Sequence, residues 1–197
     1  MSTIRQWIAS NRPLLLAAFV SFLGLPACIF VHELGHYAVA RAYGWQTTLF
    51  PAMVTYTGNP DRNPRLLFLL AGPLIDLLQI GSGIAILWRF RHRRDRERLA
   101  FYWVGVILTF VSVKWVLTPL IAPFHTWNDE RQISTLIGCP PMVLPGLVLI
   151  PGLICLSFLI RQHLRHGAIH SLVLIPAGGL SGAGLWINLL GPWLLGR

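Results

Sequence analysis

The sequence predicts an all-α membrane protein of about five transmembrane helices, with a short strand-like loop between the first two. Its 197 residues are 54% hydrophobic and only 12% charged, whereas soluble domains are about 25% charged. Its mean hydropathy is +0.61. Five apolar runs, each suited to a hydrocarbon core of about 30 Å, cover approximately residues 13–44, 65–88, 99–121, 142–160 and 168–195. We therefore expect one polytopic domain over residues 1–197, embedded in a lipid bilayer.

The charge pattern indicates membrane topology, not a nucleic-acid partner. The net charge is +9, but the arginines gather in short segments between apolar runs, chiefly 89–98 and 161–166. Such clusters mark cytoplasmic loops. If both segments and the N-terminus lie in the cytoplasm, the chain makes five spans and its C-terminus lies outside. We expect an integral protein of a bacterial cell membrane in this orientation.

The first apolar run is long enough to cross the membrane with residues to spare. Pro13 suits a first helical turn, and Gly44 can end the helix. About 30 residues give roughly 45 Å of helix, so the last third reaches the far interface. Pro26 is expected to kink it. Leu25-Pro26-Ala27-Cys28 resembles a lipoprotein cleavage box, but we expect the segment to be retained, because cleavage would remove the helix that positions the motif after it.

That motif is His32-Glu33-Leu34-Gly35-His36. Positions four apart share one face of a helix, so His32 and His36 can present two imidazole nitrogens to one metal ion. Glu33 can act as general base toward a water activated by zinc. The alternative, polar residues buried by accident, is disfavoured because ionisable side chains are costly at membrane depth. The sequence thus predicts zinc ligands at His32 and His36 and a catalytic Glu33.

The segment after the first run changes character. Residues 45–50 and 53–57 are rich in β-branched and aromatic types, and Pro51 separates them. This composition predicts a short hairpin or two extended pieces, with a plain surface loop as the alternative.

The second and third runs carry Asp76 and Lys114, which is the only lysine. Antiparallel neighbours would hold these side chains at nearly equal depth, where a salt bridge removes two unpaired charges from lipid. Such pairing would leave Asp76 less available to a metal.

The proposed topology brings a distant loop to the motif, because spans one and three end on the same side of the membrane. A catalytic zinc takes three protein ligands and keeps one position open. Asp129, in the Asn128-Asp129 loop after the third run, is the predicted third ligand. Asp76 and His125 are alternative ligands. An ordinary polar turn or helix cap is the competing interpretation of Asp129, since Asn-Asp pairs are common there.

Together these features resemble the site-2 protease family of intramembrane zinc metalloproteases. The resemblance rests on His-Glu-Leu-Gly-His in a membrane helix, a strand-like loop, and Ala71-Gly72-Pro73-Leu74-Ile75-Asp76 in the next run. It covers a core of about residues 13–135, and the two additional spans over 136–197 carry no assigned motif. It implies zinc ligands and a general base at the residues given above, an aspartate after the third core span as third ligand, and a hairpin that holds the substrate extended.

The chain departs from the family pattern in two places. Asp76 stands where the second motif usually ends in Asn, and only Asn128-Asp129 matches the family's Leu-Asp-Gly segment. Relatives also keep the catalytic end near the cytosol, whereas the arginines of this chain place it on the outer side.

The implied activity is hydrolysis of peptide bonds in or near transmembrane segments of other membrane proteins. A helical substrate must unwind before attack, and an extended segment such as 45–57 can hold it by backbone pairing. Thr55, Tyr56 and Asn128 are therefore candidate substrate-positioning residues. The alternative function is a non-proteolytic metal-binding scaffold or a transport-related subunit of the same lineage, which the Asp76–Lys114 pair favours.

Overall fold

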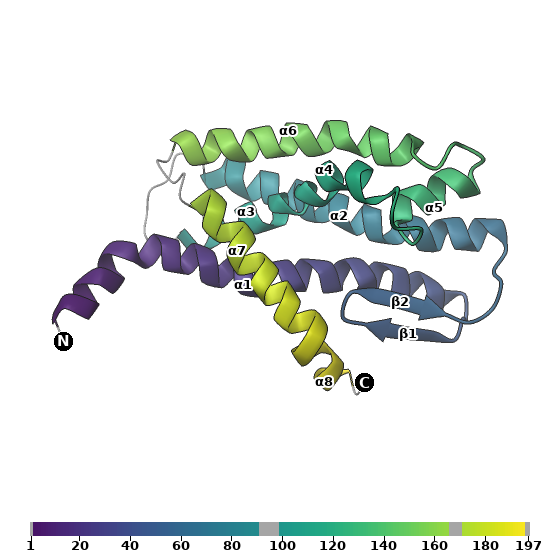
Figure 1. Ribbon diagram of the computed structural model, residues 1–197, viewed down its shortest axis with the longest axis horizontal. Coiled ribbons are helices and arrows are strands. Elements are labelled where there is room, and N and C mark those ends of the chain that lie inside the picture. The colour runs from purple at the N-terminus through teal and green to yellow at the C-terminus, as the bar shows by residue number, and fades with distance from the viewer. Residues whose placement is uncertain (1, 91–98, 166–170, 196–197) are drawn as a thin grey trace.

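The computed structural model describes residues 2–90, 99–165 and 171–195, and most of them are helical (Figure 1). The helices are α1 (Ser2–Ala42), α2 (Arg62–Phe90), α3 (Leu99–Phe110), α4 (Ser112–Ile121), α5 (Asp129–Leu136), α6 (Val143–Arg165), α7 (Ser171–Leu185), the π-helix η2 (Trp186–Leu190) and α8 (Gly191–Leu194). Strands β1 (Thr47–Phe50) and β2 (Met53–Tyr56) form a small sheet between α1 and α2.

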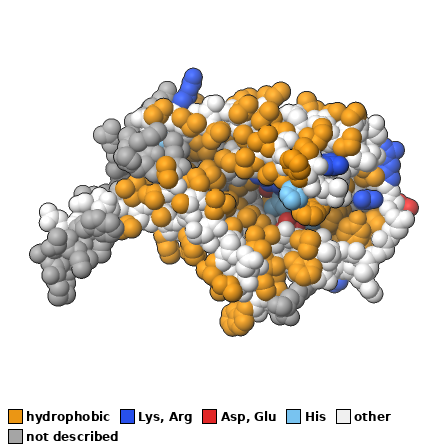
Figure 2. All heavy atoms as spheres, in the orientation of Figure 1, with side chains coloured by type: hydrophobic (Ala, Val, Ile, Leu, Met, Phe, Trp, Pro, Cys, Tyr) orange, Lys and Arg blue, Asp and Glu red, His pale blue; other side chains and the backbone are white. Residues whose placement is uncertain are grey.

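Five helical stretches in the described part of the chain are long and apolar enough to cross a membrane. They are Ser10–Ala42, Arg62–Arg89, Tyr102–Ile121, Val143–Leu164 and Val173–Leu194. Large apolar side chains on them face outward, for example Phe19, Leu78 and Leu180, each at least 60% exposed. Hydrophobic side chains cover most of the face in Figure 2, which suits contact with lipid. The expected all-α membrane architecture agrees with these observations.

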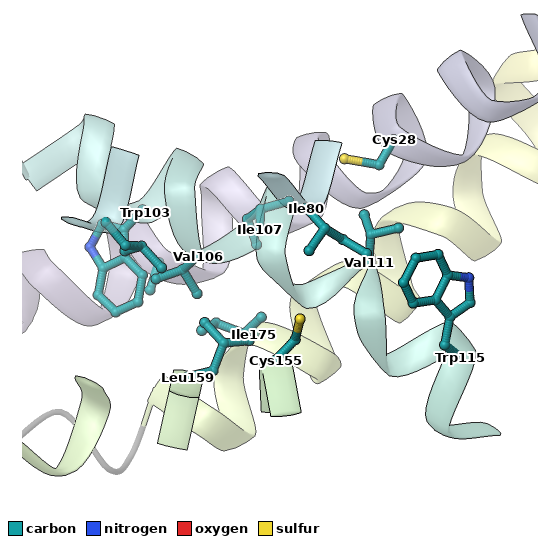
Figure 3. Packing of buried hydrophobic residues seen from close by; sticks show 12 residues of the cluster. Cys28, Ile80, Trp103, Val106, Ile107, Val111, Trp115, Cys155, Leu159 and Ile175 are labelled. Carbon is teal, nitrogen blue, oxygen red and sulfur yellow. The ribbon is translucent and has the colours of Figure 1, made fainter. Parts of the chain in front are cut away.

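The helices pack around a core that runs along the bundle. Figure 3 shows Trp103 at one end of this cluster and Trp115 at the other, with Leu159 of α6 and Ile175 of α7 approaching from below. Helices α2 and α3 pack against each other, as do α4 and α6. The third span and the two additional spans therefore share one core.

Helices α1 and α7 approach closely because small residues line their contact. A Cβ atom added at Gly178 or Gly182 would collide with the backbone oxygens of Ala18 and Phe22 respectively. Glycines four apart on one helix thus let two membrane helices touch along their backbones.

The third span is not one continuous helix. A turn at Val111 separates α3 from α4, and the backbone N–H of Lys114 donates to the oxygen of Val111 at 3.0 Å, a bond over three residues. Both helices belong to one stretch long and apolar enough to cross a membrane, Tyr102–Ile121, so the expected third span is present, with an interruption at Val111.

The segment 45–57 forms the expected hairpin. Its register pairs Thr47 with Tyr56 and Phe50 with Met53, so Pro51 and Ala52 make a two-residue turn. Before it, α1 ends in a Schellman motif: Gly44 adopts φ +71°, and the N–H groups of Gly44 and Trp45 donate to the oxygens of Arg41 and Ala40.

The hairpin, α5 and the C-terminal end of α7 lie at the end of the bundle opposite the N-terminus (Figure 1). The relative placement of the span ends therefore agrees with the expected topology. Most of the basic segment 89–98 lies outside the described residues.

Candidate metal centre

Two imidazoles of α1 face one point. His32 and His36 lie one helical turn apart, are 6% and 4% exposed, and their Nε2 atoms are 3.2 Å apart. Their rings stand almost perpendicular, at 79°. The spacing of four residues therefore places both nitrogens where one ion can reach them.

Asp129 completes the group from α5. Its Oδ2 atom lies 3.2 Å from Nε2 of His32 and 3.3 Å from Nε2 of His36. The described residues contain this one group of three potential metal ligands drawn from histidine, cysteine and acidic side chains. Residues 97 positions apart in sequence thus meet at one point.

The start of α5 is fixed by its own sequence. Asn128 is the N-cap, and its side-chain oxygen accepts a hydrogen bond from the backbone N–H of Arg131 at 3.0 Å. The Arg131 guanidinium in turn donates to the oxygens of Ala122 and Pro123, just beyond α4. Asp129 is the first residue of α5, so these bonds hold its carboxylate against α1.

The histidine tautomers follow from the partners of the other ring nitrogens. Nδ1 of His36 lies 2.7 Å from the backbone oxygen of Phe68, which can only accept, so this Nδ1 carries a hydrogen. Nδ1 of His32 lies 2.9 Å from Oδ1 of Asp76, which is likewise an acceptor when ionised. In the neutral rings, both Nε2 atoms therefore carry the lone pairs that a metal ion needs, and the Asp129 carboxylate lies beside them. A cation bound among these atoms, or a proton shared between them, would relieve their repulsion.

Asp76 belongs to the outer layer of this site and is not among the three converging ligands. Besides holding His32, it forms an ion pair with Lys114, with Oδ2 3.0 Å from Nζ. Its side chain is 2% exposed. Carboxylates that orient a metal-binding histidine recur in metal sites. The ion pair expected from the equal depth of Asp76 and Lys114 is present, and the alternative of Asp76 as a direct ligand is not supported.

Because Gly72 has no side chain, it leaves room for the ligand nitrogens of His32 and His36. A Cβ atom added there would collide with Nε2 of both His32 and His36. The Ala-Gly-Pro motif of α2 thus presents bare backbone to the ligand atoms. The sequence carried a signal for this contact, because a glycine within a helix often marks a close approach, but it did not name the partner.

The surroundings of Asp129 favour its carboxylate form, which is the form that binds a metal. Burial by itself raises the pKa of Asp129, but hydrogen bonds from the rings of His32 and His36, when these are protonated, and the ammonium of Lys114 outweigh burial and hold the pKa below its usual value. The neighbouring Glu130 differs: burial raises its pKa, and its carboxylate oxygens have no hydrogen-bond partner among the described residues. Glu130 is not part of the converging group.

Glu33 lies on the wall of a cavity of about 670 Å³ that adjoins the group. Its polar lining comes from His32, Glu33, Asp76 and Lys114, and apolar side chains of α1, α3, α4, α6 and α7 form the rest. Figure 2 shows histidine and acidic side chains at a hollow surrounded by hydrophobic ones. The cavity is within the range of ligand sites. Glu33 therefore sits beside the ligand atoms with open space next to it.

The remaining candidates are placed as follows. His125 does not join the group, and its ring packs on Trp127 at 4.7 Å between centroids. Asn128 caps α5 as described above. Tyr56 packs on Phe68, whereas Thr55 is exposed on β2. The hairpin thus adjoins Phe68, the residue whose backbone oxygen holds His36.

The geometry suits a metal ion. In a tetrahedral zinc site with bonds of about 2.0–2.2 Å, neighbouring ligand atoms stand about 3.3–3.5 Å apart, close to the 3.2–3.3 Å seen here. Negative charge from Glu33, Asp76 and Asp129 also outnumbers the single ammonium of Lys114. The donor set, its spacing and the local charge all fit a divalent cation.

Comparisons of the chain with models of protein families, with curated proteins and with solved structures find no match.

Proposed function

We propose that this protein is a zinc-dependent endopeptidase embedded in the membrane, from the lineage of the site-2 proteases, which cuts in or near transmembrane segments of other membrane proteins. The observation that carries the proposal is the convergence of His32, His36 and Asp129 within 3.3 Å of one another. The group lies on a helix long and apolar enough to cross the membrane, with Glu33 beside it.

The donor set favours zinc over Mg²⁺ and Ca²⁺. Mg²⁺ and Ca²⁺ take oxygen ligands, whereas two imidazoles and one carboxylate are typical of catalytic zinc. Three protein ligands leave one position for water or substrate. His32, His36 and Asp129 would hold the ion, with Asp76 and the Phe68 oxygen fixing the rings.

The ion and Glu33 would have separate roles in the hydrolysis. When bound, zinc supplies Lewis-acid polarisation of a peptide carbonyl and makes water acidic near neutral pH. Glu33 accepts a proton from the attacking water and passes it to the leaving amine. One C–O bond forms, the peptide C–N bond breaks, and the carboxylate returns to its starting state. Asp129 and Asp76 keep the ligand side chains in position throughout the reaction.

The surroundings support a peptide substrate. A helical peptide must unwind to expose a carbonyl, and the hairpin at this end of the bundle provides backbone groups that can pair with an extended strand. The cavity walls are largely apolar, as a segment drawn from the membrane requires. A membrane protein is therefore the proposed partner.

The test compares the wild type with Glu33→Gln, which removes the base but keeps its size. Both proteins are purified in detergent, their zinc is measured, and a transmembrane peptide is offered as substrate. We expect one zinc per chain in both, and a rate lower by about 10²–10⁴-fold in the variant, the usual contribution of a general base. Asp129→Ala is expected to lose zinc and activity together.

Two outcomes would contradict the proposal. Cleavage that persists at the wild-type rate in Glu33→Gln removes the base from the mechanism. A wild-type protein that binds zinc and cleaves no membrane substrate supports the second interpretation, a metal-binding scaffold or transport-related subunit.

A further inference from the structure

Lys114 is the one cation at the site, and it is not sealed inside its ion pair. Its Nζ atom lies 3.0 Å from Oδ2 of Asp76, yet 38% of its side chain is exposed. Because Lys114 also lines the cavity that Glu33 lines, this exposed portion faces the space next to the ligand atoms. A purely structural ion pair at membrane depth would gain by closing off both charges.

The ammonium of Lys114 also has a neighbour among the three candidate metal ligands. It lies 3.3 Å from Nε2 of His32, the atom that faces His36 and Asp129. An ammonium has three N–H donors, and Asp76 takes one. Once an ion takes the lone pair of this Nε2, that atom cannot accept, so the remaining donors face the cavity.

Lys114 follows directly after the turn that separates α3 from α4. Lys114 lies in the first turn of α4, and its backbone N–H bonds to Val111. Asp76 holds the ammonium from the side of α2 at 3.0 Å. Two separate elements therefore orient one donor toward the space beside Glu33.

Resting on the peptidase function proposed above, we propose that Lys114 is a further catalytic residue, whose ammonium donates to the carbonyl oxygen of the peptide bond under attack. Negative charge develops on that oxygen as the C–O bond forms, and a fixed donor in a dry site stabilises it. Lys114 releases no proton, because Glu33 carries the proton from water to the amine. Asp76 thus has two tasks: it orients His32 and holds the ammonium in place.

The experiment measures binding as well as turnover. Wild type, Lys114→Met, Lys114→Arg and Leu120→Met are compared for zinc content, kcat and KM on a transmembrane peptide, and affinity for a phosphinic peptide of the same sequence, which is tetrahedral and anionic. Leu120 lies on the same helix, α4, but is 67% exposed and does not line the cavity, so it serves as the matched control.

For Lys114→Met we expect one zinc per chain, kcat lower by about 10²–10³-fold, the usual loss for one such donor, and a KM within about threefold. Affinity for the phosphinic peptide should fall with kcat, because both depend on the charged tetrahedral oxygen. Lys114→Arg should recover part of both losses. Leu120→Met should resemble the wild type.

A double variant, Asp76→Asn with Lys114→Met, separates catalysis from charge balance, because it removes the charge of Asp76 together with its counter-ion. If it retains zinc and recovers wild-type kcat, Lys114 serves only to neutralise Asp76 and the proposal is overturned. It also replaces the single variant if that one does not fold. Unchanged phosphinic affinity in zinc-loaded Lys114→Met overturns the role of Lys114 alone, whereas a wild type that neither cleaves peptides nor binds the phosphinic peptide overturns the peptidase function as well.

Discussion

At the scale of single residues, the candidate metal group (His32, His36 and Asp129) depends on a glycine as much as on its own side chains. Gly72→Ala adds a Cβ at the place where the ligand nitrogens of His32 and His36 converge, so α2 must shift away from α1. We expect loss of metal from the purified protein, measured as zinc per chain after dialysis. Gly81→Ala on the same helix is the control, because its added Cβ meets nothing within 4 Å. Equal zinc in the two variants would show that Gly72 does not shape the site.

The sequence identifies some residues of this site and misses others for a physical reason. His32 and His36 are found because ligand spacing within one helix is a local property. Asp129 is found because span topology fixes which loops share a side. The Phe68 oxygen that holds His36 leaves no mark in the sequence, since every residue has a carbonyl and only helix packing decides which one lies 2.7 Å from Nδ1.

At the scale of elements, the two additional spans support the core although they contribute none of the three converging residues. Trp186 of η2 donates its indole N–H to the oxygen of Pro51 in the hairpin turn at 2.9 Å, and its ring meets Phe30 of α1 edge-on. These residues are 135 positions apart. The sequence predicts a span here but not this contact, because a π-helix and its partner depend on tertiary packing.

The contact between α7 and α1 gives a prediction with a built-in control. Gly182→Ala places a Cβ against the backbone oxygen of Phe22, whereas a Cβ at Gly184 on the same helix meets nothing within 4 Å. Overpacking of this kind costs about 1–3 kcal/mol, while Gly→Ala in an open helix position gains up to about 1 kcal/mol. We expect Gly182→Ala to lower the Tm in detergent and Gly184→Ala to keep or raise it. Zinc content should stay unchanged in Gly184→Ala, and an equal Tm in both variants would contradict the close contact.

At the scale of the whole molecule, the course of the helices and their orientation in the membrane have different origins. The fold determines that α2 runs from the hairpin end of the bundle to the opposite end. Which end faces the cytoplasm depends on charges outside the spans, because apolar helices fit a bilayer in either direction. The arginine segments place the hairpin and metal group outside, whereas the family resemblance places the catalytic end inside.

A native cysteine decides between these orientations. Cys139 lies in the turn between α5 and α6 and is partly exposed, whereas Cys28 and Cys155 are buried. If the arginines set the topology, an impermeant maleimide should label Cys139 in intact cells, and Cys139→Ser should abolish the signal. In that background Arg89→Cys, at the far end of α2, should react only after the membrane is opened. The reverse pattern would place the metal group on the cytoplasmic side, and labelling of both positions from one side would mean that α2 does not cross the membrane.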